Sequence, residues 1–214
     1  QWHPECFILE GDRSMMPLFR WFVEECENFR RAVDVHRQVL SLDSHVDTAG
    51  FIDKGYNLDT RQDNVQVDFH KLYEGKLDAV CMAAYIKQGL RDAKGFRIAK
   101  EKADRLLMGV KELVENTRTA QIAYTPRDLF RLKSQNKRAV VLAIENGYAM
   151  GNDLSLLQHY KDMGVSYITL CHNGDNDICD AARDSNGEWG GLSDFGKEVV
   201  KEMNRLGIVI DLSH

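Results

Sequence analysis

The sequence lacks any apolar run long enough to cross a membrane, and it lacks the excess of basic residues typical of nucleic-acid-binding surfaces. No stretch of 18 or more consecutive apolar residues occurs among its 214 residues. The formal net charge is −5 and the pI is about 5.8, which gives no reason to expect a nucleic-acid partner. With 43% hydrophobic and 29% charged residues, the composition is that of a globular protein. We therefore expect a folded domain with no transmembrane segment and no nucleic-acid partner.

Cysteine pairs of the C-x-x-C type are also absent. The five cysteines are Cys6, Cys26, Cys81, Cys171 and Cys179. An odd number without such a pair argues against a disulfide framework and against a cysteine zinc site. We expect most of these side chains to be small buried apolar groups, while a bridge between Cys171 and Cys179 stays open.

The chain starts with glutamine rather than methionine. We therefore expect the natural N-terminus to have been processed or removed, so a signal peptide would not be visible here. Both a cytoplasmic and an exported or periplasmic location remain compatible with the sequence.

Two regions differ in pattern. Residues 1–37 predict an N-terminal helical extension with no visible chemistry. From residue 38 onward, short apolar runs alternate with helical patterns. The runs predict strands at 39–43, 77–86, 138–144, 165–170 and 206–212, and the helical patterns lie at 95–116, 126–133, 154–163 and 195–205.

Strands that are apolar throughout and separated by helices indicate a parallel sheet covered by helices, and thus an α/β fold. A dinucleotide-binding fold would carry G-x-G-x-x-G after its first strand, and no such motif follows this one. We therefore predict that residues 38–214 form the N-terminal part of a (β/α)8 barrel, a TIM-like catalytic domain of the metal-dependent hydrolase type.

Five strands do not close such a barrel, which needs eight strands and typically about 250 residues. The last apolar run ends within two residues of position 214, and an apolar strand left as an open edge is an aggregation hazard. We therefore expect this chain to supply about the first five strands and the C-terminal part of the barrel to lie beyond residue 214.

Polar side chains follow four of the five predicted strands, where barrel enzymes place their catalytic groups. His45 and Asp47 follow the first strand, Glu145 the third, His172 the fourth and His214 the fifth. His45 and Asp47 share one face of an extended segment because side chains alternate. An imidazole and a carboxylate together suit zinc, although a His-x-Asp by itself is a weak signal and is more typical of a surface or satisfied polar pair at a strand end.

Glu145 strengthens the metal interpretation. It ends a buried apolar strand, where an unpaired charge is costly, so it needs a salt bridge or a metal cation. Its two oxygens could bridge two ions, and two metals about 3.5–4 Å apart can share a hydroxide and polarise a carbonyl. His172 or His214 alone could be an ordinary core or surface histidine. Four such strand ends together favour one shared metal site.

At this point the sequence resembles the membrane (renal) dipeptidase family of zinc dipeptidases, most of all its bacterial members. The resemblance covers about residues 36–214 and rests on several motifs in the family's order. They are LDSHVDT at 42–48, VD at 67–68, GKLDA at 75–79, IENG at 144–147, LCHN at 170–173, WGGLS at 189–193, EMNRLG at 202–207 and DLSH at 211–214.

The resemblance implies roles for individual residues. His45 and Asp47 would bind a first zinc ion, Glu145 would bridge two zinc ions, and His214 would be the first histidine of the second site. His172 would be catalytic, binding substrate and stabilising the tetrahedral intermediate. Tyr148, a further substrate-binding candidate, would belong to the pocket wall.

The implied function is zinc-dependent hydrolysis of dipeptides, including those with a C-terminal D-residue, by a hydroxide activated between two zinc ions. The partners would be a small dipeptide substrate and, as often in the family, a second copy in a homodimer. The family's second histidine on the second zinc, an arginine for the substrate carboxylate and a proton-handling aspartate would all follow His214. We therefore expect the 214-residue chain alone to hold at most one zinc ion tightly and to be inactive.

Two alternatives stay open. Another metal-dependent amidohydrolase, acting on cyclic amides or nucleobases, would commonly carry His-x-His on its first strand, where this chain has Asp47. A non-catalytic fragment or pseudoenzyme would lack the later ligands. The residues that follow His214 in the parent protein discriminate these alternatives from the dipeptidase.

Overall fold

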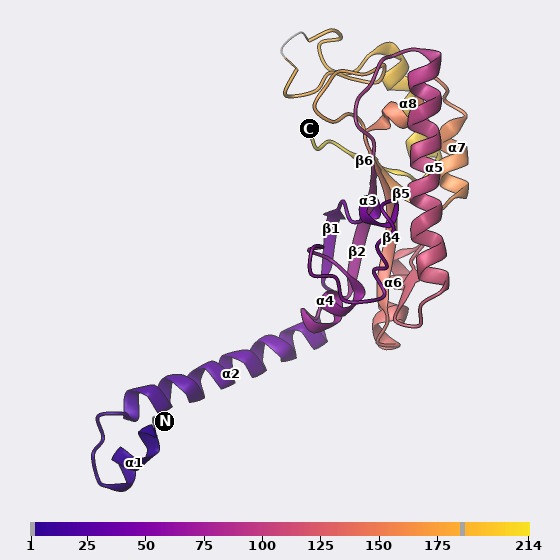
Figure 1. The fold of residues 1–214 in the computed structure, drawn as a ribbon. Helices are drawn as coiled ribbons and strands as arrows, with labels where there is room; N and C mark the ends of the chain where they lie inside the picture. The colour runs from indigo at the N-terminus through magenta and orange to yellow at the C-terminus, as the bar shows by residue number, and fades with distance from the viewer. Residues whose placement is uncertain (1–2, 185–186) are drawn as a thin grey trace. The chain divides into compact units, whose positions relative to one another are not determined.

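The computed structural model describes residues 3–184 and 187–214. The chain divides into two compact units, Gln1–Leu40 and Ser41–His214. The first unit contains helices α1 (Pro4–Leu9) and α2 (Met16–Gln38) (Figure 1). The domain boundary predicted after residue 37 stays a prediction.

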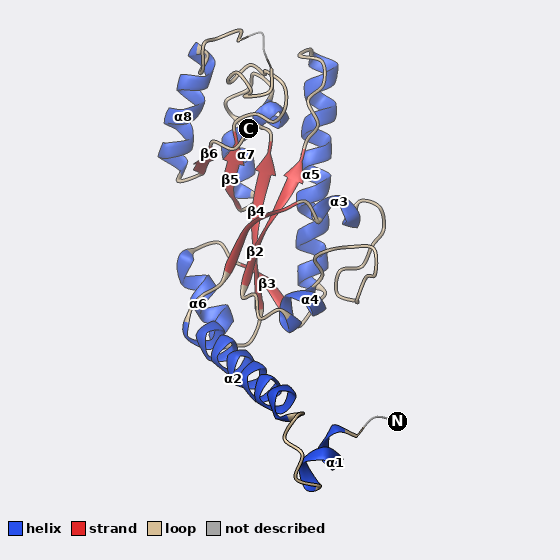
Figure 2. Cartoon of the chain, turned by 90° about the vertical axis from the view of Figure 1, so that its left-hand side faces the viewer, coloured by secondary structure: helices blue, strands red, loops and turns tan. Residues whose placement is uncertain are grey.

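The second unit is built on a parallel sheet with helices in its connections (Figure 2). Its strands are β1 (Leu42–Val46), β2 (Ala79–Tyr85), β3 (Ala120–Ile122), β4 (Arg138–Glu145), β5 (Val165–Thr169) and β6 (Val209–Asp211). Its helices are α3 (Ala49–Ile52), α4 (Phe69–Glu74), α5 (Ala93–Glu115), α6 (Pro126–Ser134), the 3-10 helix η1 (Gly147–Met150), α7 (Leu156–Asp162) and α8 (Asp194–Leu206). The predicted α/β class with a barrel-type parallel sheet is confirmed.

The strands run in the order β1-β2-β4-β5-β6. The short strand β3 pairs with the first residues of β4, whereas β5 pairs with its last residues. The prediction of five strands was therefore incomplete, because β3 is only three residues long and alternates between buried and exposed positions. The first strand was also placed too early, since residues 39–41 precede β1 and the strand itself reaches Val46.

One face of the sheet packs against helices. Met82 on β2 and Leu142 and Ile144 on β4 are fully buried in a core that includes Leu106 and Leu107 of α5. Figure 1 shows α5 and α7 on the same side of the strands. Burial of such aliphatic side chains contributes roughly 1.5–3 kcal/mol each to folding, so this face anchors the sheet.

The opposite face carries small side chains. On β4, Ala139, Val141 and Ala143 alternate with the residues that face α5, and the same alternation brings Glu145 to this face at the end of the strand. Ala79 and Ala83 occupy the neighbouring positions on β2. Both faces are thus apolar, as in sheets buried on two sides, and the small residues leave room above them for larger side chains at the strand ends.

In the described part of the chain, all five cysteines are free thiols. Cys81, Cys171 and Cys179 are buried, as expected, whereas Cys6 and Cys26 are exposed. None of the described helices is long and apolar enough to cross a membrane.

Asp78 ties the N-terminal ends of three strands together. Its Oδ2 accepts hydrogen bonds from the backbone N–H of Ser41 at 2.9 Å and from Lys133 Nζ at 2.6 Å. Arg138, the first residue of β4, has its guanidinium 3.8 Å from Oδ1. Burial raises the pKa of Asp78, but the hydrogen bonds from Lys133 and Ser41 outweigh burial and hold this pKa below its usual value.

This anchor predicts a pH-dependent contribution to stability. Because the pKa of Asp78 is lowered on folding, its carboxylate stabilises the protein fully above about pH 4 and loses this effect as the pH falls through the lowered value. Asp78→Asn should lower the free energy of unfolding at pH 7 by about 1–3 kcal/mol, because it leaves Lys133 without its carboxylate. Urea unfolding at pH 7 and pH 3 measures both effects. The matched change at the exposed Asp63, Asp63→Asn, should leave the free energy of unfolding unchanged at both pH 7 and pH 3.

Candidate metal centre

The five predicted strand-end residues gather at one edge of the sheet. His45 lies near the end of β1, with Asp47 just after it, and Glu145 is the last residue of β4. His172 lies three residues after the end of β5, and His214 lies three residues after the end of β6. Parallel register places the ends of these strands level, since Glu145 pairs with Thr169 of β5 and Thr169 with Asp211 of β6.

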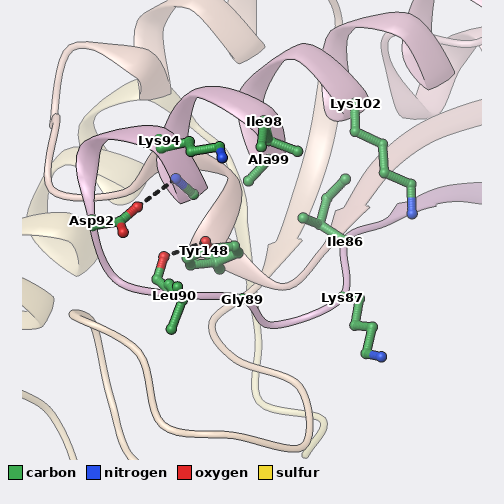
Figure 3. Close-up of a pocket in the computed structure, with 11 residues that line it drawn as sticks. Ile86, Lys87, Gly89, Leu90, Asp92, Lys94, Ile98, Ala99, Lys102 and Tyr148 are labelled. Carbon is green, nitrogen blue, oxygen red and sulfur yellow. Dashed lines mark hydrogen bonds between the residues drawn. The ribbon is translucent and has the colours of Figure 1, made fainter.

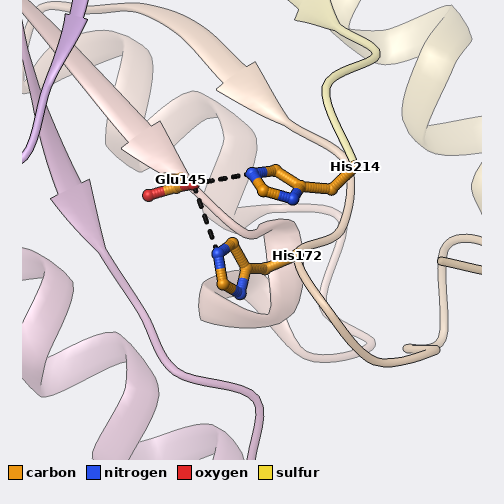
Figure 4. Close-up of side chains that lie close together, drawn as sticks. All are labelled: Glu145, His172 and His214. Carbon is orange, nitrogen blue, oxygen red and sulfur yellow. Dashed lines mark hydrogen bonds and ion pairs between the residues drawn. The ribbon is translucent and has the colours of Figure 1, made fainter. Parts of the chain in front are cut away.

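The two oxygens of the Glu145 carboxylate face different partners. Oε2 lies 3.4 Å from Nε2 of His45. Oε1 lies 3.1 Å from Nε2 of His214 and 3.6 Å from Nε2 of His172 (Figure 4). Potential ligand atoms therefore form two groups that share Glu145, one with His45 and Asp47 and the other with His172 and His214, each within 4.8 Å.

Glu145 is a buried charge without a cationic partner of the usual kind. It is only 5% exposed, and within residues 3–184 and 187–214 no lysine or arginine nitrogen comes within 4.0 Å of its oxygens. Burial raises its pKa, but the hydrogen bond and charge of His45 outweigh burial and lower it. The same contact raises the pKa of His45. The carboxylate is thus held ionised and depends on the imidazoles around it.

The pKa values of Asp47 and His172 shift in opposite directions. Burial and the negative charge of Glu145 raise the pKa of Asp47. Burial lowers the pKa of His172, and a nearby His214 acts in the same direction. His172 is therefore neutral at physiological pH, with a free ring nitrogen. Its ring lies against His214 with centroids 4.3 Å apart and against Tyr85 at 4.8 Å.

The donor set fits a metal ion. Carboxylate oxygens and imidazole nitrogens are the ligands that zinc accepts, and imidazole favours zinc, iron, copper or nickel over magnesium and calcium. A cation between these groups would supply the positive charge that the buried Glu145 otherwise lacks. Two ligand groups on the two oxygens of one carboxylate match the arrangement of sites that hold a metal pair.

Hydrogen bonds from residues that are not themselves ligand candidates hold the ligand-bearing segments in place. The sequence pattern did not identify these supporting residues. The hydroxyl of Tyr167 lies 2.6 Å from Nδ1 of His45. Thr169 donates a hydrogen bond to Asp211 at 2.6 Å, and Asp211 accepts another from the backbone N–H of Ser213, next to His214. Alternation along β5 puts Tyr167 and Thr169 on the same face of the sheet as Glu145. This alternation is the feature of the sequence from which the two supporting residues could have been predicted.

Asn146 joins three loops directly behind Glu145. Its side-chain N–H groups donate to the carbonyl oxygen of Ile86 at 3.0 Å and to Gln88 at 3.2 Å. Its side-chain oxygen accepts from the backbone N–H of Tyr148 at 3.1 Å and from Asn176 at 3.0 Å. Asn146 is fully buried and has a positive φ of 86°, so a side chain with both donors and acceptors offsets a backbone that most residues avoid.

We expect Asn146→Ala to lower the free energy of unfolding by roughly 2–4 kcal/mol, because it leaves several buried partners unsatisfied and keeps the unfavourable φ. Asn146→Gly is the matched variant, since it loses the same hydrogen bonds but relieves the backbone. Urea unfolding should place the glycine variant between the wild type and the alanine variant. A cost below about 0.5 kcal/mol for alanine would show that the network contributes little.

Tyr148 lies apart from this cluster. It is buried in η1, its hydroxyl donates to the carbonyl oxygen of Leu90 at 2.6 Å, and its ring packs against Phe96 of α5. Tyr148 lines a cavity of about 370 Å³ together with residues that follow β2 and residues of α5, and Figure 3 shows its side chain there. The structure does not bring Tyr148 together with the metal-ligand candidates, and its predicted contact with substrate stays a hypothesis.

A parallel barrel-type sheet with carboxylates and imidazoles converging at its carboxyl edge is the arrangement of metal-dependent hydrolases. Comparison with known proteins gives the family. The sequence profile of the membrane dipeptidases, peptidase family M19, matches residues 29–214. The chain therefore belongs to the membrane dipeptidase family, which is a family of metallopeptidases.

Similar proteins agree with this assignment. Dipeptidase verJ of Clonostachys rogersoniana is 28% identical over 204 residues, 88% of this chain and 52% of that protein. Dipeptidase tcpJ of Claviceps purpurea is 31% identical over 156 residues, 69% of this chain and 36% of that protein. The structure of the probable dipeptidase PvdM from Pseudomonas aeruginosa matches with a TM-score of 0.74 and 27% identity, over 86% of this chain and 49% of that one. The chain thus spans about half the length, or less, of these relatives.

Proposed function

We propose that this chain contributes the first part of the active site of a zinc dipeptidase that holds two metal ions. The proposal depends on one observation: the two carboxylate oxygens of Glu145 face two separate groups of potential ligands. Membership of the membrane dipeptidase family supports dipeptides as the substrate class. The family resemblance extends this class to dipeptides with a C-terminal D-residue.

Each residue has a defined part in this proposal. His45 and Asp47 would hold one ion and His214 the other, while Glu145 would bridge the pair. When bound, the two ions would lower the pKa of water and polarise the scissile carbonyl. The residues themselves fix the position of that chemistry, because Glu145 ends β4, whose Leu142 and Ile144 are fully buried, and His45 lies on β1, which pairs with the buried strand β2.

His172 would act on the substrate rather than on the metal. Its lowered pKa keeps the ring neutral, so its ring N–H can donate a hydrogen bond to an oxygen that gains negative charge during the reaction. Its Nε2 is 3.6 Å from Glu145, further than that of His214 at 3.1 Å. This difference favours His214 as the ligand and leaves His172 to face the substrate.

The two alternatives are weighed by specific features. Asp47 stands where many other metal amidohydrolases carry the second histidine of His-x-His, which favours the dipeptidase. A non-catalytic role would leave the buried Glu145 with three histidines and no cation, which is a costly arrangement without a function. Zinc and a dimeric state both follow from the family resemblance and belong to this proposal.

The full-length protein should hydrolyse an L,D-dipeptide, and a chelator should abolish turnover that added zinc restores. Turnover is measured by release of the free amino acid, and metal content by elemental analysis of the same sample. Glu145→Gln should reduce both zinc binding and turnover, because the neutral amide cannot bridge two cations. Turnover that survives complete removal of metal would contradict the proposal.

His172→Asn separates substrate binding from metal binding. We expect it to lower kcat/KM by about 100- to 1000-fold, the loss typical of removing one donor to a developing oxyanion. Zinc content should stay at the wild-type value. Loss of one zinc ion in this variant would instead show that His172 binds zinc together with Glu145 and His214.

A further inference from the structure

Tyr167 connects two strands that do not pair with each other. It lies on β5, whereas His45 lies on the edge strand β1, and β2 and β4 separate the two in the sheet. The Tyr167 hydroxyl nevertheless comes to 2.6 Å from Nδ1 of His45 and to 3.0 Å from the carbonyl oxygen of Ser44. The phenol therefore reaches to β1 across the face of the sheet that carries Glu145.

The backbone of β1 is adapted to this contact. Its pairing with β2 shifts register between Asp43 and Val46, and both Ser44 and His45 lie in this interval. Irregularities of this kind re-aim side chains next to active sites. The backbone N–H of His45 donates to Asp43 at 3.1 Å, so the Asp43 carboxylate binds the main chain and leaves the imidazole to Tyr167.

The number of protons decides the direction of each hydrogen bond. The Tyr167 hydroxyl carries one proton, because a phenol with its ordinary pKa of about 10 is protonated at neutral pH. The Ser44 carbonyl oxygen can only accept. If the phenol donates to Ser44, then its oxygen must accept from Nδ1–H of His45, and both contacts are satisfied at once.

We propose that Tyr167 is a positioning residue for the metal centre, which holds His45 in the tautomer with its proton on Nδ1. Nε2 is then the nitrogen that gives up its proton when a metal binds, and its lone pair lies on the side of the ring that faces Glu145 at 3.4 Å and Asp47 at 3.6 Å. The opposite direction, with the phenol donating to Nδ1, would put the proton on Nε2 and block the ligand position. This inference rests on the proposed function, because it assigns His45 to the metal.

The test is Tyr167→Phe in the full-length protein, which removes one oxygen atom and keeps the ring. We expect one of the two zinc sites, the one with His45 and Asp47, to bind about 10- to 100-fold more weakly, the usual effect of losing an outer hydrogen bond to a ligand. Competition with a chromophoric chelator measures both zinc affinities. The second site, with His214, should keep its affinity because Tyr167 does not contact it.

Nitrogen-15 NMR of the histidine rings gives an independent readout. In the zinc-loaded wild type, His45 should show a protonated Nδ1 and a metal-bound Nε2. In Tyr167→Phe, the Nδ1 proton should exchange with water faster, since its acceptor is gone. A metal-bound Nδ1 in the wild type would overturn the inference.

Tyr160→Phe is the matched control. Tyr160 is fully buried, and its hydroxyl donates to the carbonyl oxygen of Ala149 at 2.9 Å, so the variant loses the same atom and a similar bond that does not involve a metal-ligand candidate. It should lower the melting temperature but leave both zinc affinities within about twofold of the wild type. Equal affinities in Tyr167→Phe and Tyr160→Phe would reduce Tyr167 to a structural residue.

The two proposals fail in different ways. A wild-type protein that binds no zinc would contradict the proposed function. A wild type with two zinc sites and a Tyr167→Phe variant with unchanged affinities would contradict only the positioning role.

Discussion

The structure depends on one buried carboxylate. Glu145 ends a strand that is apolar on both faces, and burial alone would make its charge unfavourable. Three imidazoles surround it, from strands that lie on either side of it in the sheet. An anion without a lysine or arginine partner at the carboxyl edge of a parallel sheet is the electrostatic condition for a cation site. The ligands, their supporting contacts and the proposed chemistry follow from that condition.

The sheet separates stability from function along its strands. At the N-terminal edge, Asp78 pairs with a lysine and with the backbone at Ser41, which fixes the ends of neighbouring strands. At the C-terminal edge, Glu145 faces imidazoles and no fixed cation in the described part of the chain. A carboxylate is therefore neutralised by a lysine at one end of the sheet and left available for a metal ion at the other. Barrel enzymes commonly divide their two ends in this way.

Supporting contacts around the site come from residues that are distant in sequence. Asn146 binds loops that follow β2 and β5, and Tyr167 reaches from β5 to His45 on β1. Both use a side chain with few rotatable bonds, and both make more than one hydrogen bond. Such contacts restrict the ligand-bearing segments and so help to hold the ligand atoms close to one another.

The positions of the ligand candidates were predictable from the sequence because strand ends are local features. A buried apolar run that stops at Glu145, or one followed by His172, can be recognised from neighbouring residues alone, and parallel strands end at a common edge. The short strand β3 was missed, because three alternating residues give no clear period. The family resemblance implied a place for Tyr148 in the pocket wall, and this stays a hypothesis; the turn at Asn146 directs its ring toward Phe96 of α5, which the sequence pattern did not indicate.

The sequence by itself determined the fold class, the strand ends that carry chemistry and the family, since these depend on local periodicity and on motifs in order. Only the tertiary structure decided that the two oxygens of Glu145 face different histidines and that Tyr167 is the partner of His45. These contacts join residues 69 to 122 positions apart. The physical reason is that a hydrogen bond across the sheet depends on strand register and on side-chain length. Neither produces a periodic pattern in the amino-acid sequence.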